Sequence, residues 1–251
     1  MRVYIHRPDQ TPFSINRQVA LVGFSLRGED VRLFDTAEYD ALPLTQEDIV
    51  VGGVGFVQRA LKRLNLTVPL LASVPSSLAV FAGRKIWRSA LIDARRAVER
   101  GEGIFIKPLP EQLKLFSGQP LRQFADLLQT AHLPDDTLVE CSELTPFVSE
   151  YRTFVVHGEI VGLRHYNGNP LIFPDAACIR AAIAAYQDAP SGYALDVGVC
   201  EHGRTLLVEV NDGYAVGSYG LSPLTYAALI DARWAELRQN KSDKFLGCVP
   251  D

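Results

Sequence analysis

The stretch that decides the fold is Tyr193–Leu221, with the sequence YALDVGVCEHGRTLLVEVNDGYAVGSYGL. Its pattern predicts two short apolar strands, Tyr193–Cys200 and Thr205–Val210, joined by a polar turn. Asp196 lies within the first strand, and Glu209 lies at the end of the second. An ionised carboxylate in an apolar strand is costly to desolvate unless it is paired or binds a metal. These two acids are therefore the first candidates for a functional site.

Pairing of the two strands would bring Asp196 and Glu209 close together. Two neighbouring carboxylates favour a shared cation. Mg²⁺ suits such hard oxygen ligands, because it usually takes one or two carboxylates together with phosphate oxygens. The alternative is an ordinary hairpin whose acidic side chains lie in water at the strand ends. These residues alone leave both interpretations open.

Length and composition indicate a globular protein. The chain has 251 residues, of which 47% are hydrophobic and 22% charged, enough for a substantial core in one large domain or a few lobes. The net charge of −4 argues against a general nucleic-acid binder. The N-terminus lacks the apolar core of a signal peptide, and no apolar run reaches the roughly 18 residues of a membrane helix. The four cysteines show no CxxC spacing, so we expect reduced thiols, no membrane association and a cytosolic location. The sequence gives no sign of the oligomeric state.

The beginning of the chain predicts a small α/β unit. A short strand at Met1–His6 is followed by a strand at Asp48–Val51, the turn Gly52–Gly55, and an amphipathic helix at Phe56–Leu64. A helix that begins at such a turn can hold an anion through its free N–H groups. The glycines form neither a complete GxGxxG nor a Walker A motif. Close packing of strand against helix is the commoner reason for glycines here.

The remaining segments predict alternating helices and strands. Residues 70–82 contain a Pro-Ser-Ser break and resemble a linker. We expect helices at 89–100, 121–128, 174–187 and 223–238, strands at 104–108, 147–156 and 159–166, and a polar tail at 239–251.

Basic side chains interrupt three of these strands. Lys107 closes an apolar strand, which is costly unless its ammonium group reaches a cleft or an anion. Glu150 and Arg152 alternate onto one face of the strand 147–156, and the return strand brings in Arg164. Each arginine could serve a local ion pair. Two arginines and a lysine opposite a carboxylate pair, however, are typical of a polyphosphate site with a metal.

These motifs, in this order, resemble the ATP-grasp superfamily over residues 83–237. The resemblance rests on four sequence motifs: IFIKP (104–108), ECSEL (140–144), SEYR (149–152) and EVNDGY (209–214). The combination of two arginines and a lysine is most similar to the R2K clade of this superfamily. The glycine-rich loop that covers the phosphates in many of its members is not evident, and the segment 108–119 could fold over the site through Ser117 and Gly118.

The resemblance implies roles for residues on the nucleotide side of the site. Lys107 would contact the α- and β-phosphates of ATP, and the backbone of a hinge would clasp adenine. The hinge residues are Glu140, Cys141, Ser142, Glu143 and Leu144. Either Glu143 or Glu150 would contact the ribose. A further basic residue in this lobe would be Lys85 or its neighbour Arg84.

The resemblance also implies roles for residues on the catalytic side of the site. Asp196, Glu209 and Asn211 would bind Mg²⁺, since residues 209 and 211 alternate onto one face of a strand. Arg152 and Arg164 would clamp the γ-phosphate or an acyl-phosphate intermediate. Tyr214 or Tyr219 could line the acceptor pocket or could be packed aromatic residues.

The fold expected from the resemblance is α/β (α+β), with two ATP-grasp lobes that clasp ATP behind a small Rossmann-like α/β domain. The expected division is 1–75 for that domain, 76–143 for the N-terminal lobe and 144–251 for the C-terminal lobe with the metal site. The expected activity is an ATP- and Mg²⁺-dependent carboxylate–amine (or thiol) ligase with unidentified carboxylate and amine substrates. The alternatives are an ATP-binding module without ligase activity and a phosphotransferase.

Overall fold

The computed structural model describes residues 1–8, 12–112 and 115–246. Within these residues the strands form three sheets, with the orders β2-β1-β3, β4-β7-β5-β6 and β11-β10-β8-β9. The first sheet is parallel and the other two are antiparallel. The combination of helices with separate parallel and antiparallel sheets agrees with the α+β class expected from the sequence.

The first sheet consists of β1 (Arg2–His6), β2 (Asp30–Phe34) and β3 (Ile49–Val51). It packs with α1 (Ile15–Leu26) and α2 (Val54–Arg63). The predicted order of strand, glycine turn and helix is confirmed, because the glycine turn leads from β3 directly into α2. The central strand β1 is almost wholly buried, as is usual for a strand inside a parallel sheet whose faces are covered by helices. A short 3₁₀ helix, η1 (Tyr39–Ala41), lies between β2 and β3.

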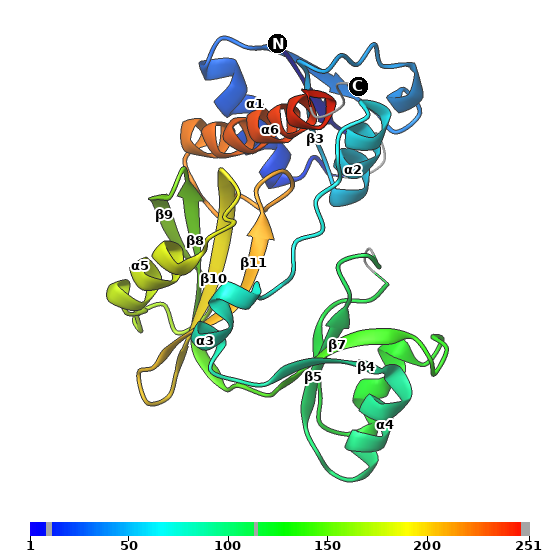
Figure 1. Ribbon diagram of the computed structural model, residues 1–251, viewed down its shortest axis with the longest axis vertical. Helices are drawn as coiled ribbons and strands as arrows, with labels where there is room; N and C mark the ends of the chain where they lie inside the picture. The colour runs from blue at the N-terminus through cyan, green and yellow to red at the C-terminus, as the bar shows by residue number, and fades with distance from the viewer. Residues whose placement is uncertain (9–11, 113–114, 247–251) are drawn as a thin grey trace.

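The C-terminal helix α6 (Pro223–Leu246) returns to this first sheet and packs along α1 (Figure 1). The contact is close: a Cβ atom at Gly23 of α1 would lie 2.0 Å from the carbonyl oxygen of Pro223, so only glycine fits there. Trp234 of α6 is fully buried in the same core. The helix extends beyond its predicted end, because residues 239–246 continue it. Residues 247–251 of the predicted tail lie outside the described part.

The second sheet consists of β4 (Ile86–Ala90), β5 (Ile104–Pro108), β6 (Gln119–Leu121) and β7 (Leu138–Glu143), and α4 (Leu91–Glu99) covers it. The predicted strand 104–108, which contains Lys107, is therefore confirmed as β5.

Two helix predictions in this region were wrong in part. The helix predicted from Ser89 begins at Leu91, because Ser89 pairs with Val139 as part of β4. The helix predicted at 121–128 is the 3₁₀ helix η3 (Phe124–Thr130), and Leu121 ends strand β6. Backbone pairing with neighbouring strands overrides local helical periodicity in both places.

The third sheet consists of β8 (Phe147–Val156), β9 (Glu159–Gly168), β10 (Gly192–Cys200) and β11 (Thr205–Asp212), and α5 (Ala176–Ala185) covers one of its faces. The bounds of β8 are those expected from its alternation. The hairpin predicted from Tyr193–Leu221 is confirmed as the antiparallel pair β10–β11.

The segment predicted as a linker packs against the third sheet. It contains η2 (Ser76–Leu78) and α3 (Ala79–Ala82). Leu78 is fully buried in the core beneath β10 and β11, and the N–H of Val210 donates to the carbonyl of Ser73 at 2.7 Å. The segment that connects the first sheet to the second therefore packs into the core of the third sheet.

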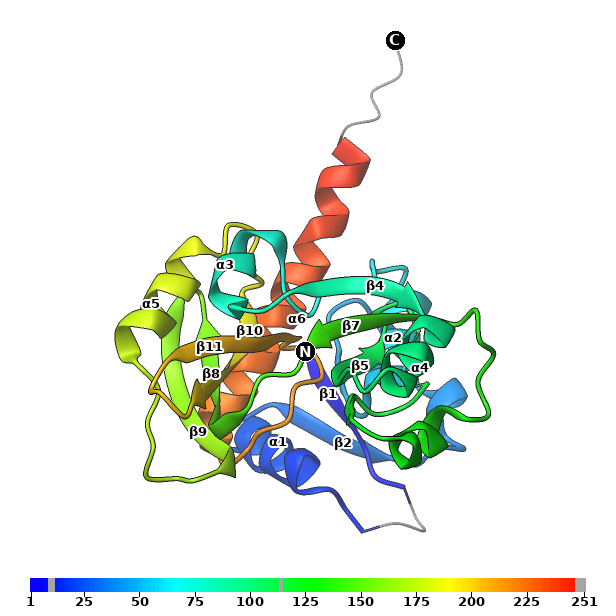
Figure 2. The same cartoon turned by 90° about the horizontal axis from the view of Figure 1, so that it is seen from below.

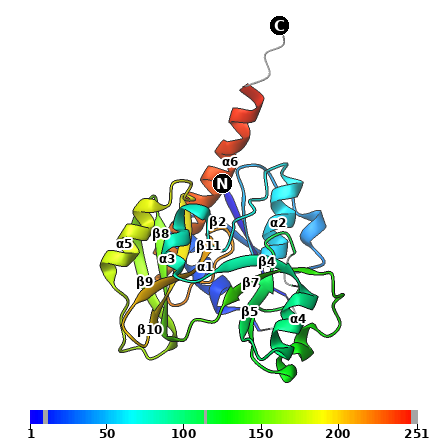
Figure 3. The same ribbon diagram turned by 60° about the horizontal axis from the view of Figure 1, so that its bottom comes forward.

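The second and third sheets lie side by side, with α4 and α5 on their outer sides (Figure 3). The view from below shows the C-terminal end of α6 projecting away from the rest of the molecule (Figure 2). Among the described residues, no helix combines the length and apolar character needed to cross a membrane.

Candidate functional site

Four charged residues form one row across the third sheet. Asp196 of β10 lies opposite Glu209 of β11 on one side and opposite Arg152 of β8 on the other, and Arg152 lies opposite Arg164 of β9. Residues directly opposite each other in antiparallel strands share one face of the sheet. The register therefore places Glu209, Asp196, Arg152 and Arg164 in sequence on the face turned away from α5, with two negative charges followed by two positive ones.

The centre of the row is a buried ion pair. Arg152 donates to Asp196 through Nε at 2.7 Å and through Nη2 at 2.6 Å, and the two side chains are 8% and 3% exposed. Burial raises the pKa of Asp196 to about 6, although Arg152 acts in the opposite direction. Ionisation of the Asp196 carboxylate is therefore costly, and the fixed guanidinium group of Arg152 offsets part of that cost.

Lys107 joins the row from the second sheet. Its Nζ lies 3.1 Å from Oε2 of Glu209 and 3.4 Å from Oε1 of Glu140. Burial of Glu209 acts to raise its pKa, but Lys107, Asn211 and Arg152 outweigh burial and hold that pKa below its usual value. Ser73 donates its hydroxyl to Glu140. The ammonium group that the sequence predicted to reach a cleft therefore lies between two carboxylates from different sheets.

The three predicted metal ligands lie together. Nδ2 of Asn211 donates to Oδ2 of Asp196 at 3.1 Å and to Oε1 of Glu209 at 3.2 Å. Rotation of the amide would present its oxygen at the same place, because the two ends of an asparagine amide are nearly isosteric. Two carboxylates and an amide oxygen fit Mg²⁺ in ligand type. The described residues contain no cluster of three or more Asp, Glu, His or Cys side chains that could hold a metal, and this site offers two carboxylates and one amide.

A cavity of about 400 Å³ opens between the second and third sheets, next to Lys107 and Glu209. Its lining includes most of the predicted nucleotide contacts, namely Lys107, Glu140, Cys141, Ser142, Glu143, Leu144 and Glu150, together with the predicted metal ligand Glu209. The predicted hinge residues line the cavity where β7 ends and the chain crosses to β8. The arrangement brings a basic group, a hinge and the edge of the charged row to one cavity of ligand size.

Arg84 and Lys85, which the sequence could not separate, lie in different places. Arg84 lines the cavity and donates to the carbonyls of Leu207 and Val208 on β11, at 2.7 and 2.8 Å. Lys85 is exposed, and its Nζ lies 5.5 Å from the ring centre of Trp87. Of these two neighbours, Arg84 is the one that faces the cavity.

Glu143 and Glu150 line the cavity from different sheets, Glu143 from β7 and Glu150 from β8. The carboxylate of Glu143 accepts from the backbone N–H of Lys85 at 2.9 Å and so ties β7 to the start of β4. Glu150 accepts from the hydroxyl of Tyr166 at 2.8 Å and from the amide of Asn167 at 2.6 Å. Both carboxylates lie on the cavity wall.

Two tyrosines named as possible pocket residues have different surroundings. Tyr214 is buried, and its hydroxyl accepts from Gln58 of α2 at 2.9 Å. Tyr219 is 45% exposed, and its ring centre lies 4.4 Å from the guanidinium carbon of Arg152. The carbonyl of Gly220 accepts from Nε of Arg164 at 3.1 Å. The loop after β11 therefore borders the positive end of the row, with Tyr219 exposed beside it.

Several lining residues were not predicted. Phe105, Arg122, Phe147, Asn167 and Val208 are among them. Phe105 and Phe147 are apolar residues at strand positions, a signal too common in cores to single out from sequence. Gly118 packs beside β5, where an added Cβ would lie 3.3 Å from the Cβ of Lys107. The segment that could cover the site thus returns next to Lys107, although residues 113 and 114 lie outside the described part.

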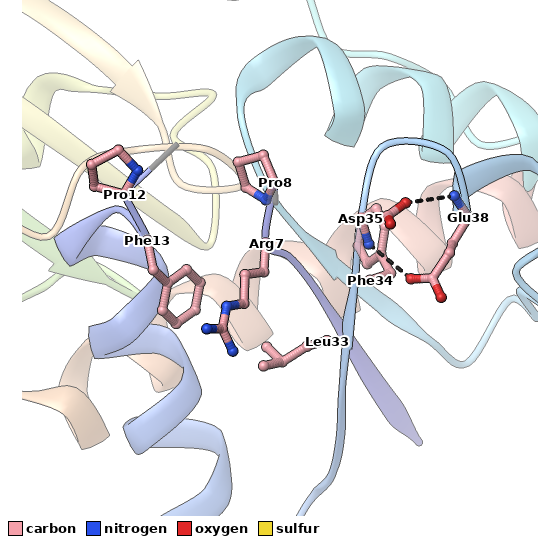
Figure 4. Close-up of a pocket in the computed structure, with 8 residues that line it drawn as sticks. All are labelled: Arg7, Pro8, Pro12, Phe13, Leu33, Phe34, Asp35 and Glu38. Carbon is pink, nitrogen blue, oxygen red and sulfur yellow. Dashed lines mark hydrogen bonds between the residues drawn. The ribbon is translucent and has the colours of Figure 1, made fainter. Parts of the chain in front are cut away.

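A second cavity, of about 500 Å³, lies at the first sheet (Figure 4). Arg7 extends between Phe13 and Leu33, while Asp35 and Glu38 each accept a hydrogen bond from the other's backbone N–H. None of the predicted site residues lines this cavity.

Comparison with solved structures identifies the fold. The D-cycloserine synthetase DcsG is 13% identical and has a TM-score of 0.59, with 94% of this chain and 100% of that chain covered. The D-alanine–D-alanine ligase from Bacillus anthracis, complexed with ATP, is 14% identical with a TM-score of 0.55 and coverage of 96% and 99%. The ATP-grasp ligase PsnB, complexed with its minimal precursor, is 14% identical with a TM-score of 0.52 and coverage of 94% and 99%. The expected ATP-grasp fold is confirmed.

Comparison of the sequence with known proteins identifies the family. No curated protein shows significant sequence similarity to the chain. The sequence model described as ATP-grasp domain, R2K clade family 2, matches residues 81–229, which is more than half of the chain and includes the second and third sheets with the charged row. The chain belongs to family 2 of the R2K clade of ATP-grasp domains.

Proposed function

We propose that this protein is an ATP- and Mg²⁺-dependent ligase that joins a carboxylate to an amine, or to a thiol, through an acyl phosphate. The observation that carries the proposal is the charged row of Glu209, Asp196, Arg152 and Arg164, with Lys107 facing it across the cavity. Proteins of the same fold are named as ligases or synthetases, and one of them was solved with ATP.

The cavity would hold the nucleotide. The backbone at residues 140–144 would contact adenine, and either Glu143 or Glu150 would contact the ribose. Lys107 would exchange Glu209 and Glu140 for phosphate oxygens, and Arg84 would add positive charge on the same wall. Mg²⁺ bound by Asp196, Glu209 and Asn211 would neutralise phosphate charge and orient the γ-phosphoryl group. In this assignment Lys85 has no direct contact with the nucleotide.

Arg152 and Arg164 would act on the transferring group. A substrate carboxylate oxygen attacks the γ-phosphorus, the bond to the bridging oxygen of ADP breaks, and an acyl phosphate forms. The amine nitrogen then attacks the carbonyl carbon and loses a proton, and inorganic phosphate leaves. Negative charge develops on oxygen in both steps, so fixed guanidinium groups stabilise both transition states. Asp196 holds Arg152 through two hydrogen bonds, which fixes the plane of that guanidinium.

The test is ADP release by purified protein with ATP and Mg²⁺, in the presence and absence of pooled carboxylates and amines. We expect ADP release that requires both pools, with a new amide identified by mass spectrometry; a thiol pool tests the thioester variant. ATP binding without turnover on any pool would instead identify a binding module, and a stable phosphorylated product would identify a phosphotransferase. We also propose that the protein is located in the cytosol, which cell fractionation would test.

A further inference from the structure

The last residue of β11, Asp212, is held by a buried arginine of the C-terminal helix α6. Nε of Arg233 donates to Oδ1 of Asp212 at 2.8 Å, and Nη2 donates to Oδ2 at 2.7 Å. The two side chains are only 6% and 8% exposed. Two parallel hydrogen bonds fix both the distance and the plane of an arginine–carboxylate pair. Arg233 therefore holds the Asp212 side chain in one orientation at the end of the strand.

The same arginine is bonded on its remaining side as well. Nη1 of Arg233 lies 2.9 Å from Oε2 of Glu236, three residues later in α6. That oxygen accepts from the N–H of Ser191 at 2.6 Å, just before β10 begins. All three nitrogens of the guanidinium group thus have a carboxylate partner. The cluster ties α6 to the start of β10 as well as to the end of β11.

Two glycines let α6 approach these strand ends closely. An added Cβ at Gly192 would lie 2.4 Å from the carbonyl oxygen of Leu229 in α6, and one at Gly213 would lie 2.2 Å from the carbonyl oxygen of Gly192. The N–H of Gly213 donates to that same carbonyl at 3.1 Å. The backbone of the helix thus lies directly against the ends of β10 and β11, which it crosses (Figure 1).

Helix α6 is itself anchored in the core of the first sheet. Trp234, the residue after Arg233, is fully buried in that core together with Ile230 and Leu237. Consecutive residues of a helix point in directions about 100° apart. One side of α6 therefore packs into the first sheet, while Arg233 reaches the end of the third sheet from a neighbouring side.

The residue before Asp212 is Asn211, the proposed metal ligand. Adjacent residues of a strand point to opposite faces. Asn211 donates to Asp196 and Glu209 on one face, and Asp212 meets Arg233 on the other. In the described sheet β11 is an edge strand, and strand ends open more readily than strand centres. Restraint of Asp212 therefore also restrains Asn211, one peptide unit away.

A buried ion pair is a costly way to hold a helix against a sheet. Replacement of such a pair by packed apolar residues is often neutral or stabilising. What the pair of Arg233 and Asp212 adds is direction, because its two hydrogen bonds are satisfied in one geometry only. The choice of residues thus points to a role in the geometry of the strand end.

We propose that Arg233 is a positioning residue for the metal site. It holds Asp212 and, through the adjacent peptide, keeps the side-chain amide of Asn211 beside Asp196 and Glu209. This inference rests on the proposed function for the role of Asn211 as a Mg²⁺ ligand. Residues that orient a metal ligand without touching the metal typically change metal affinity by about 10–100-fold.

The first test compares the ¹⁵N-labelled full chain of the parent with Arg233→Met and with Arg27→Gln. Arg27→Gln is the matched control, because it removes a different ion pair of α6, the one between Arg27 of α1 and Asp231. In the metal-free proteins we expect the backbone order parameters of Asn211 and Asp212 to fall from about 0.85 to below about 0.6 in Arg233→Met. The control should leave them unchanged.

The second test follows the response to Mg²⁺ with a non-hydrolysable ATP analogue. The Mg²⁺ concentration that gives half of the full enhancement of binding should rise about tenfold in Arg233→Met. Binding of the analogue without metal should not change, and Arg27→Gln should behave like the parent. Arg233→Lys keeps the charge but cannot form the paired hydrogen bonds, so it should show the same rise.

The double variant Arg233→Met with Asp212→Leu separates positioning from stability. It replaces the ion pair by an apolar contact, so the free energy of unfolding should recover while the response to Mg²⁺ stays weakened. If Arg233→Met does not fold, the double variant and Arg233→Lys take its place in both measurements.

Two results would overturn the inference. One is an unchanged order parameter at Asn211 when the pair is removed, and the other is recovery of the Mg²⁺ response in the double variant. A parent protein whose binding of the analogue does not respond to Mg²⁺ would count against the proposed function. The order parameters, measured without metal, would then decide alone whether Arg233 holds Asn211 in place.

Discussion

Nζ of Lys107 lies 3.1 Å from Oε2 of Glu209, so the proposed phosphate contact on the second sheet and a proposed metal ligand on the third sheet neutralise each other across the cavity. Both groups would change partners when ATP and Mg²⁺ bind, Lys107 to phosphate and Glu209 to the metal. The ion pair therefore neutralises two half-buried charges, and both belong to groups that the proposed reaction uses.

The first prediction concerns this pair. Lys107→Met leaves Glu209 beside the remaining carboxylates, so we expect the free energy of unfolding to fall at pH 7. Lys107→Met combined with Glu209→Gln should recover part of that loss, with a coupling energy of about 0.5–3 kcal/mol, the range for residues in direct contact. Denaturant unfolding of the parent, both single variants and the double variant measures this coupling. Additive effects within error would show that the pair contributes nothing.

The second prediction concerns the buried pair of Arg152 and Asp196. Arg152→Ala leaves the carboxylate of Asp196, which is 3% exposed, without its cation. Removal of one partner of a buried ion pair lowers the free energy of unfolding by about 3–5 kcal/mol. Asp196→Asn in the same background should restore most of the stability, because the amide carries no charge. Chemical denaturation of the three variants tests this. Equal stability of Arg152→Ala and the double variant would contradict it.

The third prediction is a dependence of metal binding on pH. Burial raises the pKa of Asp196 to about 6, above its usual value, so the group is neutral below that pH and ionised above it. Mg²⁺ requires the ionised form, and its affinity should therefore decline as the pH falls through about 6. Calorimetry in two buffers of different ionisation enthalpy should detect release of a proton on binding near pH 6. The same raised pKa means that this group's contribution to stability decreases as the pH rises from about 4 to 6.

Asp196→Asn is the control for the pH effect. The variant should bind Mg²⁺ weakly and without proton release at any pH between 5 and 8. If the Mg²⁺ affinity of the parent protein does not change between pH 5 and 8, the raised pKa of Asp196 has no role in metal binding.

The fourth prediction separates two neighbours. Arg84 lines the cavity and is bonded to two carbonyls of β11, whereas Lys85 is exposed beside Trp87. Arg84→Ala should weaken nucleotide binding about tenfold or more, which corresponds to about 1.4 kcal/mol. Lys85→Ala serves as the matched control and should change the Kd less than twofold. A larger loss of nucleotide affinity in Lys85→Ala than in Arg84→Ala would contradict this prediction and would place the nucleotide on the side of β4 where Lys85 lies.

The sequence predicted the charged row because its strands carry clear alternation. In β8, Glu150 and Arg152 interrupt an apolar pattern of period two, and the observed bounds Phe147–Val156 are the predicted ones. The proximity of Asp196 to Glu209 followed from a short hairpin, but their direct pairing depends on a β-bulge between Asp196 and Val197 that the sequence does not reveal.

Other features depend on contacts between distant segments. Nothing in the order Arg84-Lys85 shows that Arg84 meets carbonyls of β11, about 120 residues later in the chain. The strand at Ser89 was missed because its pairing with Val139 overrides helical periodicity.

The most direct test of the central claim is calorimetric titration of a non-hydrolysable ATP analogue, with and without Mg²⁺, into the parent protein and Glu209→Gln. We expect Mg²⁺ to strengthen binding to the parent at least tenfold. In Glu209→Gln that enhancement should disappear while metal-free binding through Lys107 persists. Full enhancement by Mg²⁺ in Glu209→Gln would contradict the assignment of Glu209 as a metal ligand, and with it the proposed site.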